Sequence, residues 1–287
     1  MLVATAVFWC GRRLYTHIPA GGRRFVSECV SAEGRAALCK LAGLFCFVAV
    51  FWSLYDQTGS AWVLQAEQMD RRFLGVVWLP SQIQAINPLL ILILVPTFNG
   101  FTVPLPRECR LHFPGLYSIA AGYVRVTPLR KMGVGFFLCA AAFAVCVPVE
   151  VWIEDGHRPS IGWQLCAYVV LTTSEVLVSI TGLEFSYTQA PPTMKSLVMA
   201  TYLLATSLGN LITMLVNLAI VDADGEARIS NVQYYTFFVG FMLISAVAFV
   251  PYAACFRERV YVQGAAVTRF DTTATSHGTG SDPDSRL

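Results

Sequence analysis

The sequence predicts an all-α membrane protein. Hydrophobic residues make up 55% of the 287 residues and charged residues only 13%, whereas a soluble domain usually carries about 25% charged residues. Six apolar segments are long enough to cross a bilayer core about 30 Å thick as helices. Two of these segments hold an acid within the apolar run, Asp56 and Glu175. A charge at the bilayer centre costs about 2.5–3.5 kcal/mol on insertion scales, so such an acid usually has a function.

The predicted spans follow one another along most of the chain. They cover residues 41–63, 76–98, 132–152, 161–187, 197–221 and 232–256, and the second could begin several residues later. A further apolar stretch, residues 1–10, is too short to span, and because charges follow it we expect the end of a truncated preceding helix and not a signal peptide. Residues 11–40 are expected to form a basic cytoplasmic connector. Residues 257–287, rich in Thr, Ser, Gly and Asp, are expected to form a disordered cytoplasmic tail.

The distribution of positive charge predicts the orientation of the spans. When the amino terminus is placed inside, the only members of the 20 lysines and arginines that fall outside are Arg71, Arg72, Arg158 and Arg228. Cytoplasmic loops carry an excess of Lys and Arg in membrane proteins. We therefore expect a multi-pass protein with both termini in the cytoplasm, and we expect it in the plasma membrane.

The first predicted span contains a polar stripe. Trp52, Asp56 and Ser60 are spaced i, i+4, i+8, so they share one face of a continuous helix. A polar face among aliphatic faces is expected to look into the bundle and away from lipid. The alternative is that Asp56 lies near the outer interface and is simply hydrated.

The fourth predicted span repeats this pattern around Glu175 and Ser179. A buried carboxyl that changes its neighbours between two conformations can take up a proton on one side and release it on the other. The segment therefore favours a role in transport. The alternative is a structural hydrogen bond from Glu175 to a neighbouring helix.

Two other spans carry polar candidates. Asn87 precedes Pro88 within the second span, where a proline would remove a helix hydrogen bond and kink the helix. The freed groups and the Asn87 amide would then serve either a kinked gate or a ligand site. Tyr202 in the fifth span can stack on or hydrogen-bond a substrate, or it can pack helices together.

Enzyme signatures are absent from the sequence. The nine cysteines are scattered, with no C-x-x-C pair, which argues against a zinc or redox site. There is no Walker A sequence, no G-x-S-x-G and no H-E-x-x-H. We expect no enzymatic activity, no metal, no organic cofactor and no nucleic-acid partner.

Three segments carry a family resemblance. FWSLYDQTGSAWVLQAEQM, SQIQAINPLLILILVPTF and SEVLVSITGLEFSYTQAPPTMKS resemble the proton-dependent oligopeptide transporter (POT/PTR) family of the major facilitator superfamily. The resemblance extends over about residues 1–256. It implies that the six spans match helices seven to twelve of a twelve-helix transporter, so that residues 41–256 form a six-helix half-bundle of the major facilitator type.

The resemblance also implies a function and roles for the residues. The function would be proton-coupled symport of di- and tripeptides, with protons as the coupling ion. Substrate-binding roles would fall on Trp52, Asn87, Glu175, Ser179 and Tyr202, and proton coupling or gating on Asp56 and Glu175. At the position of Tyr202 the family usually has a tryptophan, so the preference for substrate side chains is open.

Part of the family's sequence pattern does not occur in this sequence. The E-x-x-E-R motif and the basic cavity residues of the family belong to its amino-terminal half, and this sequence lacks them. We expect a missing amino-terminal six-helix half as partner, with the chain being a gene fragment or one of two chains. Two alternatives stay open: the same fold carrying nitrate or another small solute, and a non-transporting fragment that associates with a full-length relative.

Overall fold

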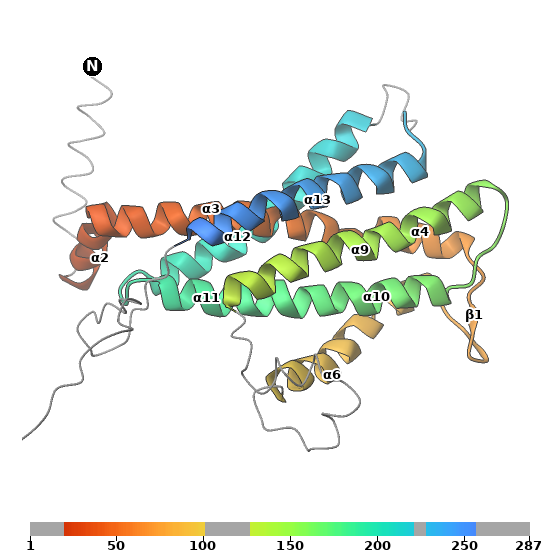
Figure 1. The fold of residues 1–287 in the computed structure, drawn as a ribbon, viewed down its shortest axis with the longest axis horizontal. Coiled ribbons are helices and arrows are strands. Elements are labelled where there is room, and N and C mark those ends of the chain that lie inside the picture. Colours follow the sequence, from red (N-terminus) through yellow and green to blue (C-terminus); the bar gives the residue numbers. More distant parts are fainter. Residues whose placement is uncertain (1–19, 101–126, 221–227, 257–287) are drawn as a thin grey trace, which may run out of the picture.

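The computed structural model describes residues 20–100, 127–220 and 228–256. Long helices lie side by side in one bundle, with a short hairpin at one end (Figure 1). The helix end predicted at residues 1–10 and the tail predicted at 257–287 lie outside the described residues. The predicted connector is described only in part, and there it is helical.

The elements follow in chain order. They are α2 (Ala20–Val30), α3 (Ala32–Tyr55), the 3₁₀ helix η1 (Asp56–Gly59), α4 (Ala61–Gln68), β1 (Arg72–Phe73), β2 (Val76–Val77), α5 (Pro80–Ile83), α6 (Ile86–Gly100), α9 (Pro128–Glu154), α10 (Gly162–Glu175), the π turn η2 (Val176–Ile180), α11 (Thr181–Gln189), α12 (Lys195–Ile220) and α13 (Asn231–Cys255).

The membrane-protein prediction is confirmed for most of the spans. Within the described residues, five helical stretches are long and apolar enough to cross a bilayer: Gly34–Gln68, Pro128–Glu154, Gly162–Gln189, Lys195–Ile220 and Asn231–Cys255. These match the predicted first, third, fourth, fifth and sixth spans to within a few residues, except that the first helix begins earlier and ends later than predicted. The chain is an all-α, multi-pass membrane protein.

The second predicted span begins several residues later than residue 76, the alternative that the sequence left open. Its first residues form strand β2, which pairs with β1 in an antiparallel hairpin. Leu74 and Gly75 turn the hairpin with positive φ angles of 54° and 77°, as a tight two-residue β-turn requires. The apolar helical stretch runs only over Pro80–Val95, with a two-residue turn between α5 and α6. The polar residues before Asn87 therefore belong to a separate short helix.

The predicted kink at Pro88 is also wrong. Helix α6 begins at Ile86, so Pro88 lies in its first turn. A proline is tolerated there because the backbone N–H groups of a first turn have no partner within the helix. Asn87 is consequently a helix-start residue and not the site of a bend.

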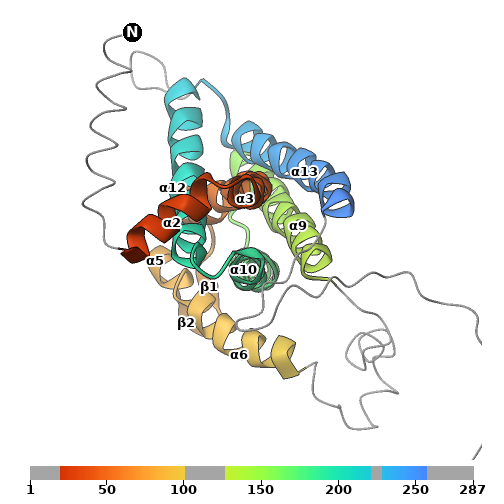
Figure 2. The ribbon, with the colours of Figure 1, turned by 90° about the vertical axis from the view of Figure 1, so that its left-hand side faces the viewer.

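The core lies between α3, α9, α10 and α13. Helix α9 packs on both α13 and α10, and α12 packs on α3, as the end view shows (Figure 2). Large aromatic side chains fill the interior, among them Trp62, Phe51, Phe136, Phe143, Phe238 and Phe249. Many leucines on α12 stay exposed, as expected of a surface that faces lipid or another protein.

Glycine permits a close contact between α12 and α3. A Cβ atom at Gly209 of α12 would lie 2.6 Å from the Ala49 carbonyl oxygen of α3. Small residues allow such close approach between membrane helices. This contact brings the polar side chains of α12 to the end of α3, where the candidate site lies.

Candidate functional site

Three helix ends meet at the centre of the candidate site. Tyr55 is the last residue of α3, Asn87 is the second residue of α6, and Glu175 is the last residue of α10. The regular α-helical pattern ends or begins beside each polar residue. Helix α3 is followed by a 3₁₀ turn, α10 is followed by a π turn, and α6 begins after a short turn. Helix ends leave backbone groups without partners inside the helix and therefore attract polar side chains.

The three side chains form one hydrogen-bond network. The Tyr55 hydroxyl donates to Glu175 Oε2 at 2.8 Å. Asn87 Nδ2 lies 2.5 Å from the Tyr55 hydroxyl and 3.1 Å from the same Glu175 oxygen. The carboxyl of Glu175 therefore accepts from donors on two other helices, which stabilises a negative charge in an apolar setting.

Thr172 extends the network by one more residue. Its hydroxyl lies 2.5 Å from Asn87 Oδ1 and 2.7 Å from the Tyr168 carbonyl oxygen, one turn back on α10. Asn87 thus uses both ends of its amide within the bundle. The start of α6 is held on α10 by this pair.

The π turn follows Glu175 directly and changes the helical register. Such turns are uncommon and frequently occur at functional sites. Helix α9 approaches the turn closely, because a Cβ atom at Gly135 would lie 2.5 Å from Val178 Cγ2, and the Ser174 hydroxyl donates to the Gly135 carbonyl oxygen at 2.6 Å. Ser179 lies within this π turn, so it does not continue the regular helix face that its spacing from Glu175 predicted.

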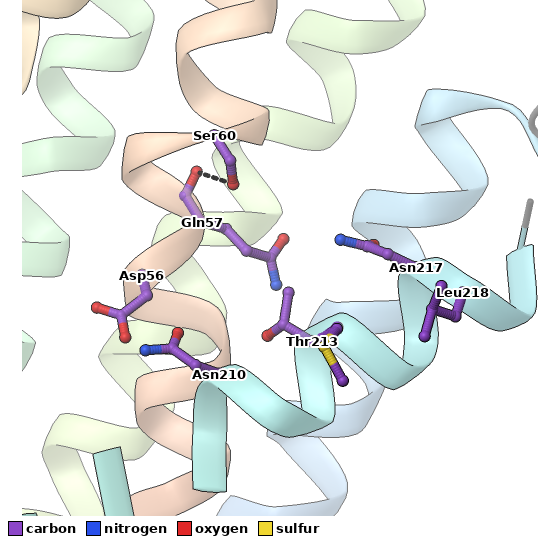
Figure 3. Close-up of a pocket in the computed structure, with 8 residues that line it drawn as sticks. Asp56, Gln57, Ser60, Asn210, Thr213, Asn217 and Leu218 are labelled. Carbon is purple, nitrogen blue, oxygen red and sulfur yellow. Dashed lines mark hydrogen bonds between the residues drawn. The ribbon is translucent and has the colours of Figure 1, made fainter. Parts of the chain in front are cut away.

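Asp56 borders a cavity of about 440 Å³ between η1 and α12. Its half-buried carboxyl interacts with the side-chain amide of Asn210, which faces it across the cavity (Figure 3). Ser60 and Asn217 line the same cavity. Glu175 does not border this cavity, although the two carboxyls are close enough to interact electrostatically.

Trp52 does not join Asp56 in lining this cavity. The helix becomes a 3₁₀ turn at Asp56, so the i, i+4, i+8 stripe is broken after Trp52. The indole packs edge-on against Phe51 and Tyr55, with ring centroids 5.5 and 5.1 Å apart. Trp52 therefore supports the Tyr55 ring of the network.

Tyr202 packs helices together in this structure. Its side chain is only 3% exposed, its ring packs edge-on against Phe45, and its hydroxyl donates to the Ser179 carbonyl oxygen at 2.9 Å. This is the packing role that the sequence left open. Contact of Tyr202 with a substrate stays a prediction.

The network includes one residue that the sequence gives little reason to select. Tyr55 lies in an apolar run and resembles an ordinary packing residue there, and only its position next to Asp56 could have indicated it. Thr172 is different, because the sequence places its hydroxyl one turn before Glu175 on the same helix.

The arrangement provides one carboxyl with fixed donors and a neighbouring polar cavity. Such a carboxyl can bind an ammonium group or take up a proton. Groups of three or more His, Cys, Asp or Glu residues that could hold a metal ion do not occur in the described parts of the chain. Broken helices that converge on a polar site within a membrane bundle are typical of secondary transporters.

Comparison with known proteins agrees with the class of secondary transporters. The sequence model of the POT family matches residues 23–237. The chain therefore belongs to this family. The chain is 41% identical over 132 residues to Peptide transporter 3 of Caenorhabditis elegans and 36% identical over 150 residues to human Solute carrier family 15 member 2. These alignments cover 45% and 52% of the chain but only 17% and 19% of the relatives.

Solved structures give the same result. The crystal structure of an auto-inhibited POT family peptide transporter matches with a TM-score of 0.67 and 35% sequence identity, over 81% of this chain and 43% of that one. The POT family transporter PepTSo matches with a TM-score of 0.64 and 35% identity, over 76% and 41% of the two chains. The chain thus spans less than half of each of these two transporters.

Proposed function

We propose that this chain acts as the carboxy-terminal half of a proton-coupled symporter for di- and tripeptides, together with a six-helix amino-terminal half. The observation that carries the proposal is the partly buried carboxyl of Glu175, held by donors from α3 and α6. Relatives named as peptide transporters and structures of POT transporters support it.

Glu175 would bind the ammonium end of the peptide. A peptide is a zwitterion, so its site needs a fixed acid for one end and a fixed base for the other. The described residues whose side chains hydrogen-bond the Glu175 carboxyl are Tyr55 and Asn87, neither of which carries a positive charge. The base for the carboxylate end would come from the amino-terminal half.

The same carboxyl would couple transport to protons. In the empty carrier it would bind a proton, and in the loaded carrier it would exchange the proton for the peptide ammonium group. Asp56 would act beside it, either in coupling or in gating the outer end. Rocking of one half-bundle against the other around this site would give alternating access.

The orientation completes the proposal. We place both termini in the cytoplasm and the protein in the plasma membrane, with the β1–β2 hairpin outside. An inward proton gradient would then drive uptake, and a membrane potential adds about 2.3 kcal/mol per charge per 100 mV.

Uptake by a reassembled transporter tests the proposal. The chain is co-expressed with the amino-terminal six helices of a POT relative, and the complex is placed in liposomes with an inward proton gradient. We expect accumulation of a labelled dipeptide that excess unlabelled dipeptide prevents and nitrate does not, because a carboxylate repels an anion. Inhibition by nitrate instead would favour an anion carrier.

A matched pair of variants isolates the role of Glu175. Glu175→Gln keeps the side-chain shape but removes the charge, and we expect it to abolish proton-driven accumulation. Glu184→Gln makes the same change at an exposed position on α11 and should leave uptake unchanged. Full accumulation by Glu175→Gln would refute the proposed role.

A further inference from the structure

A fully buried acid lies away from the network of Glu175. Glu150, near the end of α9, is 1% exposed and borders a cavity of about 390 Å³. Helices α4, α12 and α13 supply the remaining walls of this cavity. Ser60 and Asn217 line it as well as the Asp56 cavity, so the two cavities adjoin.

The cavity is acidic. Glu67 lines it together with Glu150, and neither Lys nor Arg is among its lining residues. A carboxyl inside a membrane bundle is usually paired with a cation or marks an ion pathway. Glu150 therefore lacks a positive partner among the groups that form its cavity.

The donors around Glu150 are already used. Gln65 Nε2 donates to Glu150 Oε2 at 2.7 Å and to the Cys146 carbonyl oxygen at 3.1 Å. Both of these partners are acceptors, so the orientation of the Gln65 amide is determined by them. The Tyr235 hydroxyl, which interacts electrostatically with Glu150, donates its proton to the Ala61 carbonyl oxygen at 2.9 Å.

Oxygen acceptors without a hydrogen-bond donor remain beside Glu150. Gln65 is 2% exposed, and its Oε1 atom is buried with no hydrogen-bond partner in the described structure. The Tyr235 oxygen keeps a lone pair, and Glu150 brings a full carboxylate. A buried acceptor without a partner costs about 1–3 kcal/mol, and a positive ion is the ligand that satisfies several oxygens at once.

We propose that Glu150, the Gln65 carbonyl and the Tyr235 hydroxyl bind a small monovalent cation, of the sodium or potassium kind. One buried carboxylate balances one positive charge. A divalent ion such as Ca²⁺ commonly takes six to eight oxygens with several carboxylates, which this place does not offer. This site is separate from the Glu175 network and does not rest on the proposed transport activity.

Thermal unfolding of the purified chain in detergent tests the site. At one pH, sodium or potassium chloride is compared with the same concentration of choline chloride, whose large cation cannot fit between the oxygens. A ligand that binds only the folded state stabilises it, and at a hundredfold excess over Kd we expect the Tm to rise by about 5–10 °C. The rise should vanish in Glu150→Gln and persist in Glu184→Gln.

A direct measurement of ion binding to the wild-type chain tests the proposal even if Glu150→Gln does not fold. Equilibrium binding of radioactive sodium, or of rubidium as a potassium substitute, should saturate at one ion per wild-type chain. A Tm that is the same in all three salts, an equal rise in Glu150→Gln, or binding that does not saturate would overturn the proposal. If Glu150 simply carries a proton, the Tm at fixed pH will not depend on sodium or potassium.

Discussion

The hydrogen bond from Tyr55 to Glu175 makes a quantitative prediction about the stability of the bundle. This bond joins residues that are 120 positions apart in the sequence, at an O···O distance of 2.8 Å. If it forms, the cost of removing the Tyr55 hydroxyl must depend on whether Glu175 is present. Tyr55→Phe removes the hydroxyl, and Glu175→Met removes both carboxyl oxygens while keeping a side chain of similar length.

The size of the coupling follows from the geometry. Hydrogen bonds between membrane helices couple by about 0.6 kcal/mol on average and by at most about 1.7 kcal/mol. A charged acceptor roughly doubles the strength of a bond, but the strongest bonds from hydroxyl to carboxylate are shorter, at about 2.5–2.7 Å. We therefore expect a coupling free energy of about 1–1.5 kcal/mol between the two substitutions.

The assay is reversible unfolding of the purified chain in mixed micelles with increasing amounts of a denaturing detergent. Tyr55→Phe should lower the free energy of unfolding by about 1–2 kcal/mol in the wild-type background and by much less beside Glu175→Met. The control combines Tyr55→Phe with Glu184→Gln, whose effects should add. If the costs of Tyr55→Phe and Glu175→Met also add within about 0.5 kcal/mol, the network does not exist as described.

Three further predictions test other parts of the structure. Gly135→Ala places a methyl group 2.5 Å from the nearest side-chain carbon of the π turn, so we expect a loss of about 1–3 kcal/mol in the same unfolding assay; unchanged stability would contradict the close approach. Thr172→Val leaves Asn87 Oδ1 without its donor and should cost about 1–3 kcal/mol, whereas a gain would show that this bond is absent. Arg72→Cys should react with a membrane-impermeant thiol reagent on intact cells, above the reaction of the unmodified chain, and Arg35→Cys only after permeabilisation. The reverse result would invert the proposed orientation.

The sequence indicated the acids of the site better than their partners. Glu175 stands out because a charge in an apolar run is costly and has to be explained. Tyr55 does not stand out, because an aromatic residue in such a run is ordinary. Only the fold shows that the end of α3 lies beside the end of α10, and this depends on contacts between residues far apart in the sequence.

The second span shows where hydrophobic patterning fails. Averaged over 76–98, the composition is apolar enough for a membrane helix, so Pro88 looked like an internal kink. Hairpin geometry at Leu74 and Gly75, together with the turn before Ile86, divides the segment into a strand, a short helix and α6. Averaging the hydrophobicity over a window does not detect such breaks, because the average depends on composition and not on backbone conformation.

Glu150 escaped the sequence analysis for a related reason. It lies close to Glu154 and Asp155 at the end of the third span, where one more acid does not stand out. The structure buries Glu150 under Gln65 of α4 and leaves Glu154 exposed. Depth along a single helix predicts exposure to lipid or water, but only the packing of α4 on α9 decides which acid is buried.

The breaks in the helices connect the fold to the proposed transport. Tyr55 and Glu175 each end a helix just before a 3₁₀ or π turn, and Asn87 begins one just after a turn. A regular α-helix resists bending because each turn is bonded to the next, whereas a 3₁₀ or π turn changes the bonding pattern and is a place where helices bend. Joining the three breaks through one carboxyl means that any ligand or proton that changes the charge of Glu175 acts on α3, α6 and α10 together. This is the coupling that an alternating-access carrier needs, since occupancy of a single group must bias the position of several helices.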